Sequence, residues 1–517
     1  MSDKLQIKYI FYSKIHYFYF LALKLKNIQS SIMKYPLIQN YIAGEFTVSF
    51  SSKTMDVISP IDGVLLSKVP LSSATDLNTA VAAAKKAFPG WSKTPIKERV
   101  QVFFRYKTLL EKHLKELAEL CSEENGKTYG ESVAEIEKCI ELTEFATSLP
   151  QLVTGEILEV SRGVECKTEH VALGVVASIV PFNFPAMVPN WTLPNAIALG
   201  NCMIMKPSEK VPLSCGRLAE LLKEAGLPDG VFNIVHGDVE IVNAICDHPD
   251  IEAVSFVGST KIAKIVYQRA TSNFKRCLAL GGAKNHLLVL PDAIPGMTAQ
   301  NVAASMSGCA GQRCMAASAM IGVGDVDEII NKICDEARKI IPGENLGPVI
   351  NKESQIRIEQ YITDAENDGA TILVDGRKTT VKGKENGTYI GPTVIDHVKP
   401  EMSVATEEIF GPVISIIRTK TVDEALAIEN ANPYGNAASV FTQNGGMARY
   451  IIDRASAGMI GVNVGVPVPR EPFSFGGWNE SKFGVGDITG KSSIEFWTKL
   501  KKSTTKWNAD AGVNWMS

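Results

Sequence analysis

The stretch ALGVVASIV at residues 172–180 decides the fold, because it opens a series of short apolar runs. Similar runs follow at residues 201–206, 231–235, 253–257 and 286–290. Segments with a helical pattern separate several of them, at residues 213–225, 240–246 and 261–270. Short buried strands that alternate with helices are typical of a parallel sheet covered by helices on both faces. The sequence therefore predicts an α/β fold with a doubly wound parallel sheet.

Helices and a second α/β alternation flank this series. Upstream, apolar residues at helical spacing predict one helix that Trp91 and Pro95 end, and two more at residues 97–123 and 130–147. Downstream, residues 295–475 again alternate strand and helix patterns. This second alternation predicts a second doubly wound domain.

A small β-ribbon is expected outside these two domains. Glu156–Val160 and Glu165–Val171 flank the turn at residues 162–163, and Ile494–Leu500 is predicted as a strand that returns to them. Exposed strand edges pair readily with another chain. We therefore expect the ribbon to take part in oligomerisation.

These patterns divide the chain into four parts. Residues 33–150 and 172–290 would form the first α/β domain, and residues 291–485 would form the second. Residues 151–171 and 486–507 would form the ribbon and its C-terminal strand. Residues 1–32 are an extension.

The extension differs in composition from the rest of the chain. No acid occurs between Asp3 and Glu45, and seven aromatic residues lie within residues 9–20. Its apolar stretch at residues 15–25 is too short to span a bilayer. A transit peptide would be equally poor in acids but rich in arginine, which this segment lacks. We interpret the extension as a targeting segment or a start codon read too early, and favour Met33 as the functional start.

Composition indicates a globular enzyme. The 517 residues are 45% hydrophobic and 21% charged, and the net charge of −3 gives no field that would attract nucleic acid or an anionic membrane. The ten cysteines occur singly, without the spacing of a disulfide framework or a zinc site. We expect a cytoplasmic protein, or a mitochondrial matrix protein in a eukaryote, with no metal, nucleic-acid or membrane partner.

Two polar segments follow neighbouring predicted strands of the first domain. FVGST at residues 256–260 places Gly258 and Ser259 at the start of a helix, where backbone amides favour phosphate. MKPSE at residues 205–209 places Lys206 and Glu209 where they could bind ribose hydroxyls. Each segment alone is more typical of a helix cap or a solvated turn. Together, on one sheet, they favour a dinucleotide site.

The segment GCAGQRCMA at residues 308–316 predicts a nucleophile. Small residues surround Cys314, so a substrate can approach its thiol closely, and Arg313 lies beside it. A nearby cation lowers the pKa of a thiol and favours the reactive thiolate. The other nine cysteines are interpreted as inert core residues.

Two more segments stand out. PFNFP at residues 181–185 holds Asn183 between two prolines, so its amide could be a fixed donor to a developing oxyanion. EEIFGP at residues 407–412 places two acids before an aromatic residue and a Gly-Pro turn, and its spacing alone predicts no function.

PFNFP, KPSE, FVGST, GQRCMA and EEIFGPV, in this order, resemble the aldehyde dehydrogenase superfamily, and the resemblance extends from about Tyr41 to Trp507. It implies that family's fold, with two doubly wound parallel-sheet domains and an oligomerisation ribbon. It implies that Cys314 attacks the aldehyde carbonyl while Asn183 stabilises the oxyanion. It further implies that NAD binds to the first domain through Val180, Phe182, Lys206, Glu209, Lys210, Ser259 and Gly281, and also contacts Glu408 and Phe410 of the second.

Four further segments resemble the coenzyme A-acylating branch of this superfamily, which oxidises methylmalonate semialdehyde. They are ICDHPD at residues 245–250, GAKNH at 282–286, GVNVGVPVP at 461–469 and FSF at 473–475. The resemblance implies oxidation with decarboxylation and acyl transfer to coenzyme A as co-substrate. The products would be propanoyl-CoA, or acetyl-CoA from malonate semialdehyde, in valine or inositol catabolism.

An acid that hydrolytic relatives carry is missing. The resemblance places it at Ala279 or Leu280, and no acidic residue occurs between Glu252 and Asp292. A general base typically accelerates attack by water about 100- to 10,000-fold, whereas a thiolate needs far less help. The missing carboxylate therefore favours coenzyme A. If Glu408 is the base instead, the enzyme would be hydrolytic and release a free carboxylate.

Two arginines bind the substrate carboxylate in that branch. Arg313 matches one of them, and Lys138 stands at the position of the other. Lysine keeps the charge but lacks the bidentate fork. Malonate semialdehyde or another acyl chain therefore remains open as the substrate.

Three further expectations follow. Glu209 would repel a 2′-phosphate and so favours NAD over NADP, although the sequence does not decide between them. The resemblance implies a homodimer or homotetramer. A catalytically silent relative is the competing interpretation, and the presence of Cys314 and Asn183 argues against it.

Overall fold

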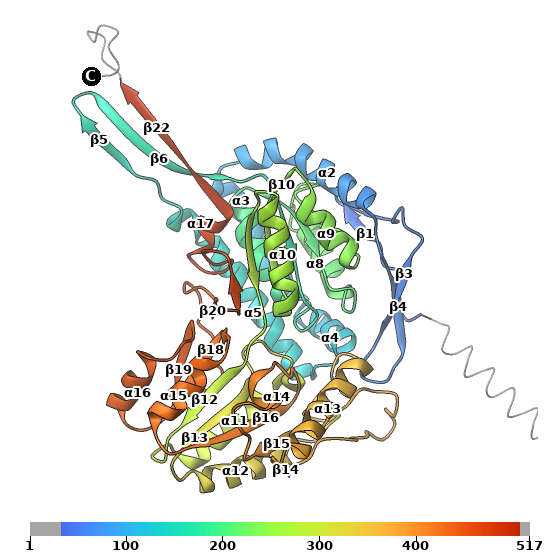
Figure 1. The fold of residues 1–517 in the computed structure, drawn as a ribbon. Helices are drawn as coiled ribbons and strands as arrows, with labels where there is room; N and C mark the ends of the chain where they lie inside the picture. Colours follow the sequence, from blue (N-terminus) through green and yellow to red (C-terminus); the bar gives the residue numbers. More distant parts are fainter. Residues whose placement is uncertain (1–32, 507–517) are drawn as a thin grey trace, which may run out of the picture.

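The computed structural model describes residues 33–506, and the extension at residues 1–32 lies outside the described residues. Two sheets form the cores of two lobes, and a β-ribbon projects from the first lobe (Figure 1). The first sheet has eight strands in the order β2 (Glu45–Thr47), β1 (Asn40–Ile42), β9 (Phe232–Ile234), β8 (Cys202–Lys206), β7 (Val175–Ile179), β10 (Ile251–Val257), β11 (Arg276–Leu280) and β21 (Lys482–Phe483). Its five central strands are parallel, and the edge strands are antiparallel.

Helices cover both faces of the first sheet. Strands β7 and β8 are buried along their whole length, so they need cover on both sides. On one face lie α2 (Ala74–Lys93), α9 (Val239–Asp247) and α10 (Thr260–Ser272). On the other lie α7 (Met187–Ala198) and α8 (Leu213–Glu224), with α3 (Ile96–Lys112), α4 (Leu114–Asn125), α5 (Tyr129–Thr147) and α6 (Leu149–Leu152) packed outside them.

The second sheet has seven strands. Their order is β14 (Thr371–Val374), β15 (Thr393–Asp396), β16 (Val413–Thr419), β13 (Ala317–Val323), β12 (Asn285–Val289), β18 (Ala437–Phe441) and β19 (Met459–Val462). All neighbours except β14 are parallel. One face is covered by α11 (Pro295–Ser307) and α12 (Asp327–Arg338), and the other by α14 (Ser403–Thr406), α15 (Val422–Ala431) and α16 (Gly445–Ile452), with α13 (Lys352–Asn367) beside α14. The expected fold class, with two doubly wound sheets and a separate β-ribbon, is confirmed.

One strand belongs to a different sheet from the one expected. The apolar run at residues 286–290 was grouped with the first sheet, but it forms β12, the starting strand of the second. The first sheet gains β11 instead, which the sequence patterns did not single out. Only four residues separate β11 from β12, so no linker in the sequence marks the passage from one lobe to the other.

One predicted helix is two helices. The segment 97–123 breaks at His113, whose φ of −101° and ψ of 14° lie outside the helical region, into α3 and α4. No glycine or proline lies in that segment, so the helical pattern runs through the break without a signal. Leu110 and Leu117 keep the helical spacing on both sides and are fully buried.

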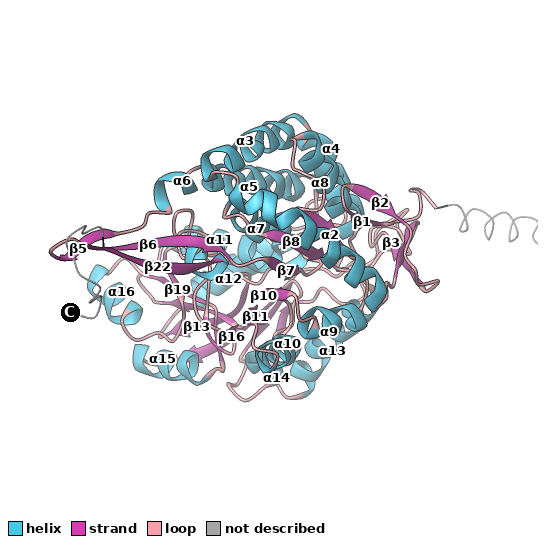
Figure 2. Cartoon of the chain, turned by 90° about the horizontal axis from the view of Figure 1, so that it is seen from above, coloured by secondary structure: helices cyan, strands magenta, loops and turns pink. Residues whose placement is uncertain are grey.

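The ribbon consists of β5 (Ile157–Ser161), β6 (Val164–Ala172) and β22 (Thr498–Lys506), and it extends away from the lobes (Figure 2). The C-terminal strand pairs with β6, as expected, but begins later than expected. Residues 493–497 form the helix α17 (Ser493–Trp497), because Phe496 and Trp497 are buried against the first lobe. The strand itself is polar, so the apolar pattern indicated the wrong segment.

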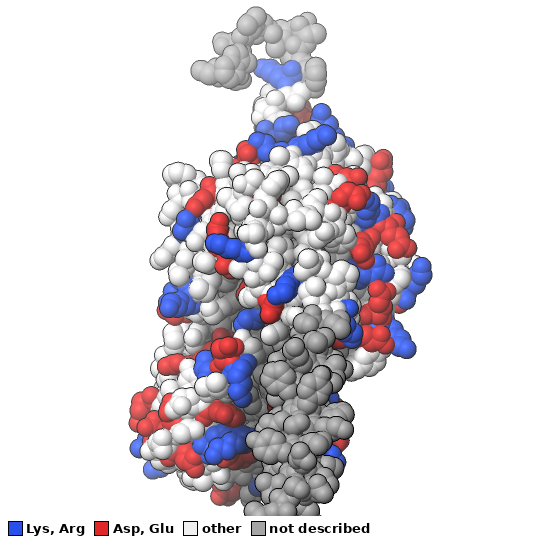
Figure 3. All heavy atoms as spheres, turned by 90° about the vertical axis from the view of Figure 1, so that its right-hand side faces the viewer, with Lys and Arg blue, Asp and Glu red and all other residues white. Residues whose placement is uncertain are grey.

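Two short antiparallel strand pairs lie outside the two large sheets and the ribbon: the hairpin of β3 (Thr54–Ile58) with β4 (Leu65–Pro70), and the pair of β17 (Tyr434–Gly435) with β20 (Trp478–Asn479). No helix within residues 33–506 has the length and apolar character needed to cross a membrane. On the face shown in Figure 3, basic and acidic side chains are interspersed and form no patch of a single sign.

Candidate active site

The two sheets face each other through opposite ends of their strands. Strands β7, β8, β10 and β11 of the first sheet point their carboxyl ends at the boundary between the lobes. The second sheet contributes the segments that precede its strands, since residues 308–316 lead into β13 and residues 407–412 lead into β16. Loops from both lobes therefore meet at one boundary, and the segments PFNFP, KPSE, FVGST, GQRCMA and EEIFGP all lie there.

The first sheet has a topological switch point at this boundary. The chain proceeds from β7 to β8 and β9 on one side, and returns to β10 and β11 on the other. Open α/β sheets bind ligands in the crevice that such a reversal creates at the carboxyl ends of the strands. The residues expected to bind NAD follow β7, β8, β10 and β11, and we call this part of the site the nucleotide edge; it comprises Val180, Lys206, Glu209, Ser259 and Gly281.

Lys206 and Glu209 form an ion pair at the end of β8. The Lys206 Nζ lies 2.8 Å from Glu209 Oε2, and Lys206 is only 5% exposed. Burial opposes ionisation of Glu209, but the Lys206 ammonium outweighs it, so the pKa of Glu209 is lowered. The amide of Val180, at the end of β7, donates to the Lys206 carbonyl at 3.1 Å. A lysine and an ionised carboxylate held next to one another offer a donor and an acceptor for a vicinal diol.

Three of the expected NAD-binding side chains lie together. Phe182 packs edge-on against Phe410, with ring centroids 5.9 Å apart, and the Lys210 ammonium lies 5.2 Å from the Phe182 ring centre. Phe182 comes from the first lobe and Phe410 from the second, so the pair spans the boundary. Phe410 has a φ of 54°, a left-handed conformation that a bulky residue rarely adopts. That conformation directs the ring from the Gly-Pro turn towards the first lobe.

Ser259 and Gly281 complete the nucleotide edge. Ser259 occupies the N-cap position of α10 and is exposed, but within the described residues its side chain makes no capping hydrogen bond. Its hydroxyl and the first amides of α10 are thus free for a phosphate. A Cβ at Gly281 would lie 2.7 Å from the Glu480 carbonyl and from Thr260 Oγ1, so this close approach excludes a side chain. The switch point, the paired Lys206 and Glu209 and the free helix N-terminus fit a dinucleotide.

The nucleophile loop, residues 308–316, has an unusual backbone. Cys309, Ala310 and Gly311 have φ values of 51°, 53° and 70°, three consecutive left-handed residues. Such conformations persist only where surrounding contacts impose them. The Cys309 amide donates to Glu131 Oε1 at 2.5 Å, and Gly311 is so close to Gly411 that a Cβ would lie 2.0 Å from its carbonyl oxygen. The EEIFGP segment thus supports the nucleophile loop directly.

Amides from two other strands hold Cys314 itself. The Cys314 carbonyl accepts hydrogen bonds from Asn285 Nδ2 and Asn436 Nδ2, each at 2.8 Å. Both asparagines lie at the amino ends of strands: Asn285 is on β12, which pairs with β13, and Asn436 comes just before β18, the next strand along. The backbone at the nucleophile is therefore fixed by the sheet, which leaves the side chain free to face the cavity.

Asn183 reaches the same loop from the first lobe. Its Nδ2 donates to the Gln312 carbonyl at 2.9 Å, two residues before Cys314, and Asn183 is 6% exposed. Its backbone carbonyl accepts from Lys127 Nζ at 2.8 Å. One Nδ2 hydrogen remains available, because an amide nitrogen carries two. The structure thus brings together the two residues to which the sequence analysis gave catalytic roles.

The sequence predicts that Arg313 lowers the pKa of the Cys314 thiol and so favours the thiolate. This prediction is wrong, because the pKa of the thiol is raised. Burial raises the pKa of the Cys314 thiol to about 12, and the Glu408 carboxylate adds to the increase. Arg313 opposes it only weakly, because its guanidinium is engaged elsewhere: Nε lies 3.3 Å from Cys309 Sγ, and Nη2 lies 3.4 Å from Glu131 Oε1. In this conformation the thiol is protonated at neutral pH, so a base must remove its proton.

Glu408 lies at the turn where the sequence lacks an acid. Its Oε1 accepts from the Ala283 amide at 3.0 Å, and a Cβ at Gly282 would lie 2.4 Å from its Oε2. Burial raises the pKa of Glu408 to about 7, although the Ala283 amide and the Lys284 ammonium oppose the shift. Lys284 is fully buried, and its Nζ has no hydrogen-bond partner within the described residues, so the pKa of Lys284 is lowered to about 7. A carboxyl whose pKa lies near neutrality has the acidity that suits a general base.

A cavity of about 450 Å³ opens beside Cys314. Apolar side chains form most of its wall, from Phe184, Met187, Trp191, Met315, Val464, Val466, Val468, Pro469 and Phe475. Arg313 and Lys138, the two residues expected to bind a substrate carboxylate, both line it. Lys138 already has partners, since its Nζ lies 2.6 Å from Glu471 Oε2 and 3.2 Å from Glu141 Oε2. Glu471 was not singled out from the sequence.

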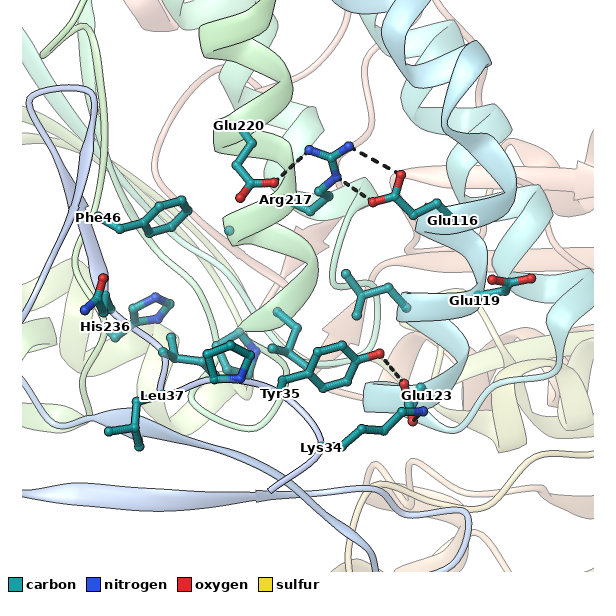
Figure 4. A pocket seen from close by; sticks show the side chains of 17 residues that line it. Lys34, Tyr35, Leu37, Phe46, Glu116, Glu119, Glu123, Arg217, Glu220 and His236 are labelled. Carbon is teal, nitrogen blue, oxygen red and sulfur yellow. Dashed lines mark hydrogen bonds and ion pairs between the residues drawn. The ribbon is translucent and has the colours of Figure 1, made fainter. Parts of the chain in front are cut away.

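A larger cavity, of about 620 Å³, lies elsewhere, between α4, α8 and the residues that precede β1 (Figure 4). Arg217 crosses it between Glu116 and Glu220, and Tyr35 donates to Glu123 at 2.6 Å. None of the residues to which the sequence analysis gave a role lines this cavity. We therefore place the candidate active site at Cys314.

Sequence reasoning missed the residues that position the site. Lys127 and Glu135 form a fully buried ion pair, and Glu135 Oε1 accepts the amides of Ala186 and Met187 at the start of α7. These residues brace the loop that carries Asn183. The sequence gives little indication that Lys127 and Glu135 are buried, since a lysine and a glutamate eight residues apart near a helix are usually exposed. Asn285 lay within the quoted segment GAKNH, but nothing in its spacing indicated a bond to Cys314.

The chain belongs to the aldehyde dehydrogenase family, because the family model matches residues 47–503. Its similarity to particular members is extensive. It is 45% identical to malonate-semialdehyde dehydrogenase 1 of Geobacillus thermodenitrificans over 91% of this chain and 99% of that protein. It is 44% identical to malonate-semialdehyde dehydrogenase 2 of Geobacillus kaustophilus, again over 91% and 99%.

Solved structures give the same picture. The methylmalonate-semialdehyde dehydrogenase of Oceanimonas doudoroffii superposes with a TM-score of 0.90 at 42% identity, over 92% of this chain and 99% of that one. A Sinorhizobium meliloti 1021 protein assigned to the methylmalonate-semialdehyde dehydrogenases, and solved in complex with NAD, gives a TM-score of 0.91 at 40% identity, over 94% and 100%. The expected resemblance is therefore confirmed, and a homologous structure binds NAD.

Proposed function

We propose that this protein oxidises methylmalonate semialdehyde or malonate semialdehyde with NAD and passes the acyl group, after loss of carbon dioxide, to coenzyme A. The products are propanoyl-CoA and acetyl-CoA. The relatives named above act, by their names, on these semialdehydes. The observation that carries the choice of coenzyme A is the turn after β11, where Ala279 and Leu280 are buried in the strand and no acid occurs between Glu252 and Asp292.

The first step forms a bond between the Cys314 sulfur and the aldehyde carbon. Glu408 takes the thiol proton, since its pKa of about 7 suits proton transfer at neutral pH. The carbonyl oxygen becomes an alkoxide, which the free Nδ2 hydrogen of Asn183 and the backbone amide of Cys314 stabilise. A preorganised donor of this kind typically contributes about 100- to 1,000-fold in rate.

The nucleotide edge holds the dinucleotide. Lys206 and Glu209 bind a ribose diol, Ser259 and the start of α10 bind the pyrophosphate, and Val180, Lys210 and Gly281 shape the crevice around them. Phe182, Glu408 and Phe410 lie at the nicotinamide end. NAD, when bound, supplies the two-electron oxidant for the carbon attached to sulfur, and the residue left on Cys314 is a thioester.

The thioester then loses carbon dioxide, and its acyl group is transferred to coenzyme A. The bond between the α-carbon and the β-carboxylate breaks, the thioester carbonyl accepts the electron pair, and the α-carbon takes a proton. The coenzyme A thiolate attacks the carbonyl carbon and displaces the Cys314 thiolate. A thiolate needs no general base for this attack, which is consistent with the absence of an acid before the turn at residues 281–284.

One observation favours the second candidate, a hydrolytic dehydrogenase. Glu408 fills the turn that lacks its own acid and influences the Cys314 thiol, so it is placed to activate water once it is deprotonated. It has a competing role at the nicotinamide ribose. We therefore rank hydrolysis second.

We further propose that the protein is a homodimer or a homotetramer assembled through its ribbon. All five residues of β5 are exposed, including Ile157, Leu158 and Val160 at 65%, 66% and 52%. An exposed apolar strand edge is a surface that another chain can cover. Sedimentation that gives only monomer would contradict this assembly.

The experiment that tests the function is the rate of NADH formation from malonate semialdehyde with increasing coenzyme A. The proposal predicts a rate that depends on coenzyme A and saturates with it. A rate independent of coenzyme A would favour hydrolysis through Glu408. If propanal but not malonate semialdehyde were oxidised, the assignment of a carboxylated substrate would be wrong.

A further inference from the structure

The cavity beside Cys314 contains five charged residues among its apolar walls: Lys138, Glu141, Arg313, Arg470 and Glu471. An aldehyde that carries a carboxylate needs an uncompensated cation in this cavity, because desolvating an unpaired anion is costly. The pairing of these five charges therefore decides which aldehydes the site accepts.

The positive charge of Lys138 is already neutralised by neighbouring carboxylates. Its Nζ lies between two carboxylates, at 2.6 Å from Glu471 and 3.2 Å from Glu141. The Glu471 side chain is only 9% exposed, so solvent screens its interaction with Lys138 little. A substrate carboxylate that approached Lys138 would meet a cluster with a net charge of −1, given one lysine and two ionised glutamates.

Arg313 is partly engaged. Its Nε donates to Cys309 Sγ, and its Nη2 lies 3.4 Å from Glu131, so Nη1 remains the free face of its guanidinium within residues 33–506. Gly308 gives this group room, since a Cβ there would lie 2.4 Å from Nη1. Arg313 can therefore offer part of a carboxylate site next to Cys314.

Arg470 is the cation without an ion-pair partner among the described residues. It is exposed, lines the cavity and directly precedes Glu471 on one loop. The same loop thus delivers an anion that neutralises Lys138 and a cation that is free. A guanidinium can bind a carboxylate through two parallel hydrogen bonds, which a lysine cannot.

We propose that Glu471 and Arg470 determine the substrate specificity of this site. Glu471 removes Lys138 from carboxylate binding, and Arg470, together with Arg313, binds the carboxylate of the aldehyde. This inference rests on the proposed function, because it concerns an aldehyde that carries a carboxylate.

The test compares malonate semialdehyde with propanal, which has the same chain length and no charge. In Arg470→Gln, the KM for malonate semialdehyde rises about 10-fold, while kcat/KM for propanal changes less than about 2-fold. In Glu471→Gln, the net charge of the cluster around Lys138 rises from −1 to 0, because Glu141 remains its one ionised partner, so the KM for malonate semialdehyde falls several-fold, again without a change for propanal. Glu144→Gln, on the same helix as Lys138 but outside this cavity, is the matched control and leaves both substrates unaffected.

Other results would overturn the proposal. If Glu471→Gln raises the KM for malonate semialdehyde, then Lys138 binds the carboxylate and Glu471 only positions it. If Glu471→Gln affects both aldehydes equally and lowers the unfolding temperature, then its ion pair with Lys138 is structural. If the KM for malonate semialdehyde is unchanged in Arg470→Gln, then Arg470 does not bind the substrate carboxylate. The wild-type enzyme distinguishes failure of the proposed function from failure of this inference. If it does not oxidise malonate semialdehyde at all, the proposed function is wrong. If it does, but the KM values do not change in the variants, only this inference is wrong.

Discussion

The nucleotide edge and the nucleophile loop hold their functional side chains in different ways. At the nucleotide edge, each residue follows directly from the strand that carries it: Lys206 ends β8, and its partner Glu209 lies three residues further along. The nucleophile loop depends on residues far away in the sequence. Cys309 is held by Glu131, and the loop before Cys314 is held by Asn183. The first kind of site is built by topology, and the second by contacts across the lobes.

Loss of the nucleophile should have the largest effect. In Cys314→Ser, turnover of malonate semialdehyde is expected to fall at least about 10,000-fold, because a serine hydroxyl in the same place is a far weaker nucleophile. NADH formation measures the loss. Cys334→Ser, which alters a buried thiol on α12, serves as the control and should retain full activity. Turnover that survived in Cys314→Ser would mean that the loop is not the reaction centre.

Asn183→Ala tests whether contacts across the lobes contribute to catalysis. We expect kcat to fall about 100- to 1,000-fold, because the oxyanion loses its side-chain donor. Alkylation of Cys314 by iodoacetamide, followed by mass spectrometry, reports whether the loop keeps its conformation. A similar alkylation rate with a lower kcat supports the oxyanion role. If both change together, Asn183 instead maintains the loop through Gln312.

The nucleotide edge should respond differently. In Lys206→Met, the KM for NAD is expected to rise about 10-fold with little change in kcat, because a uniform binding interaction is lost. Steady-state kinetics with NAD as the varied substrate give both constants. Lys223→Met, which removes an exposed lysine of α8 paired with Glu45, is the matched control. A large fall in kcat in Lys206→Met would show that the two parts of the site are not separable.

The pH dependence of Cys314 should show the smallest effect. Because burial and Glu408 raise its thiol pKa to about 12, alkylation of the free enzyme is slow at neutral pH and speeds up as the pH rises. Glu408→Gln removes the base that takes the thiol proton, so alkylation at a fixed pH should become a few-fold slower. Glu407→Gln, at the exposed neighbouring residue, should leave the rate unchanged. Faster alkylation in Glu408→Gln would show that the Glu408 carboxylate only repels the thiolate, and would contradict its role as the base.

Much of the fold could be predicted from the sequence, because buried parallel strands leave apolar runs bounded by helices. β7, β8 and β10 were found in this way, within a few residues of their ends. The passage from β11 to β12 could not be found, since both strands are short, buried and almost contiguous. Pattern alone does not say which sheet a strand joins. The same limit applies to the polar strand β22, whose partner is β6 and not a hydrophobic core.

The site was predictable where a motif is local. Lys206, Glu209, Asn183 and Cys314 each lie in a short segment that resembles the family, and the fold brings these segments to one boundary. The pKa of Cys314 was not predictable, because sequence adjacency to Arg313 does not reveal that the guanidinium turns towards Cys309 and Glu131.

Glu471 was missed for a related reason. It is 333 residues from Lys138 in the sequence and meets it only in the folded cavity. Its one local signal is a charged pair, Arg470-Glu471, at the end of a run of valines and prolines.

The most direct test of the central claim is the product formed from malonate semialdehyde and NAD in the presence of coenzyme A, identified by mass spectrometry. If Cys314 passes its acyl group to a thiol, acetyl-CoA and carbon dioxide form in equal amounts with NADH. Formation of free malonate, with coenzyme A unchanged, would contradict the account and assign water activation to Glu408.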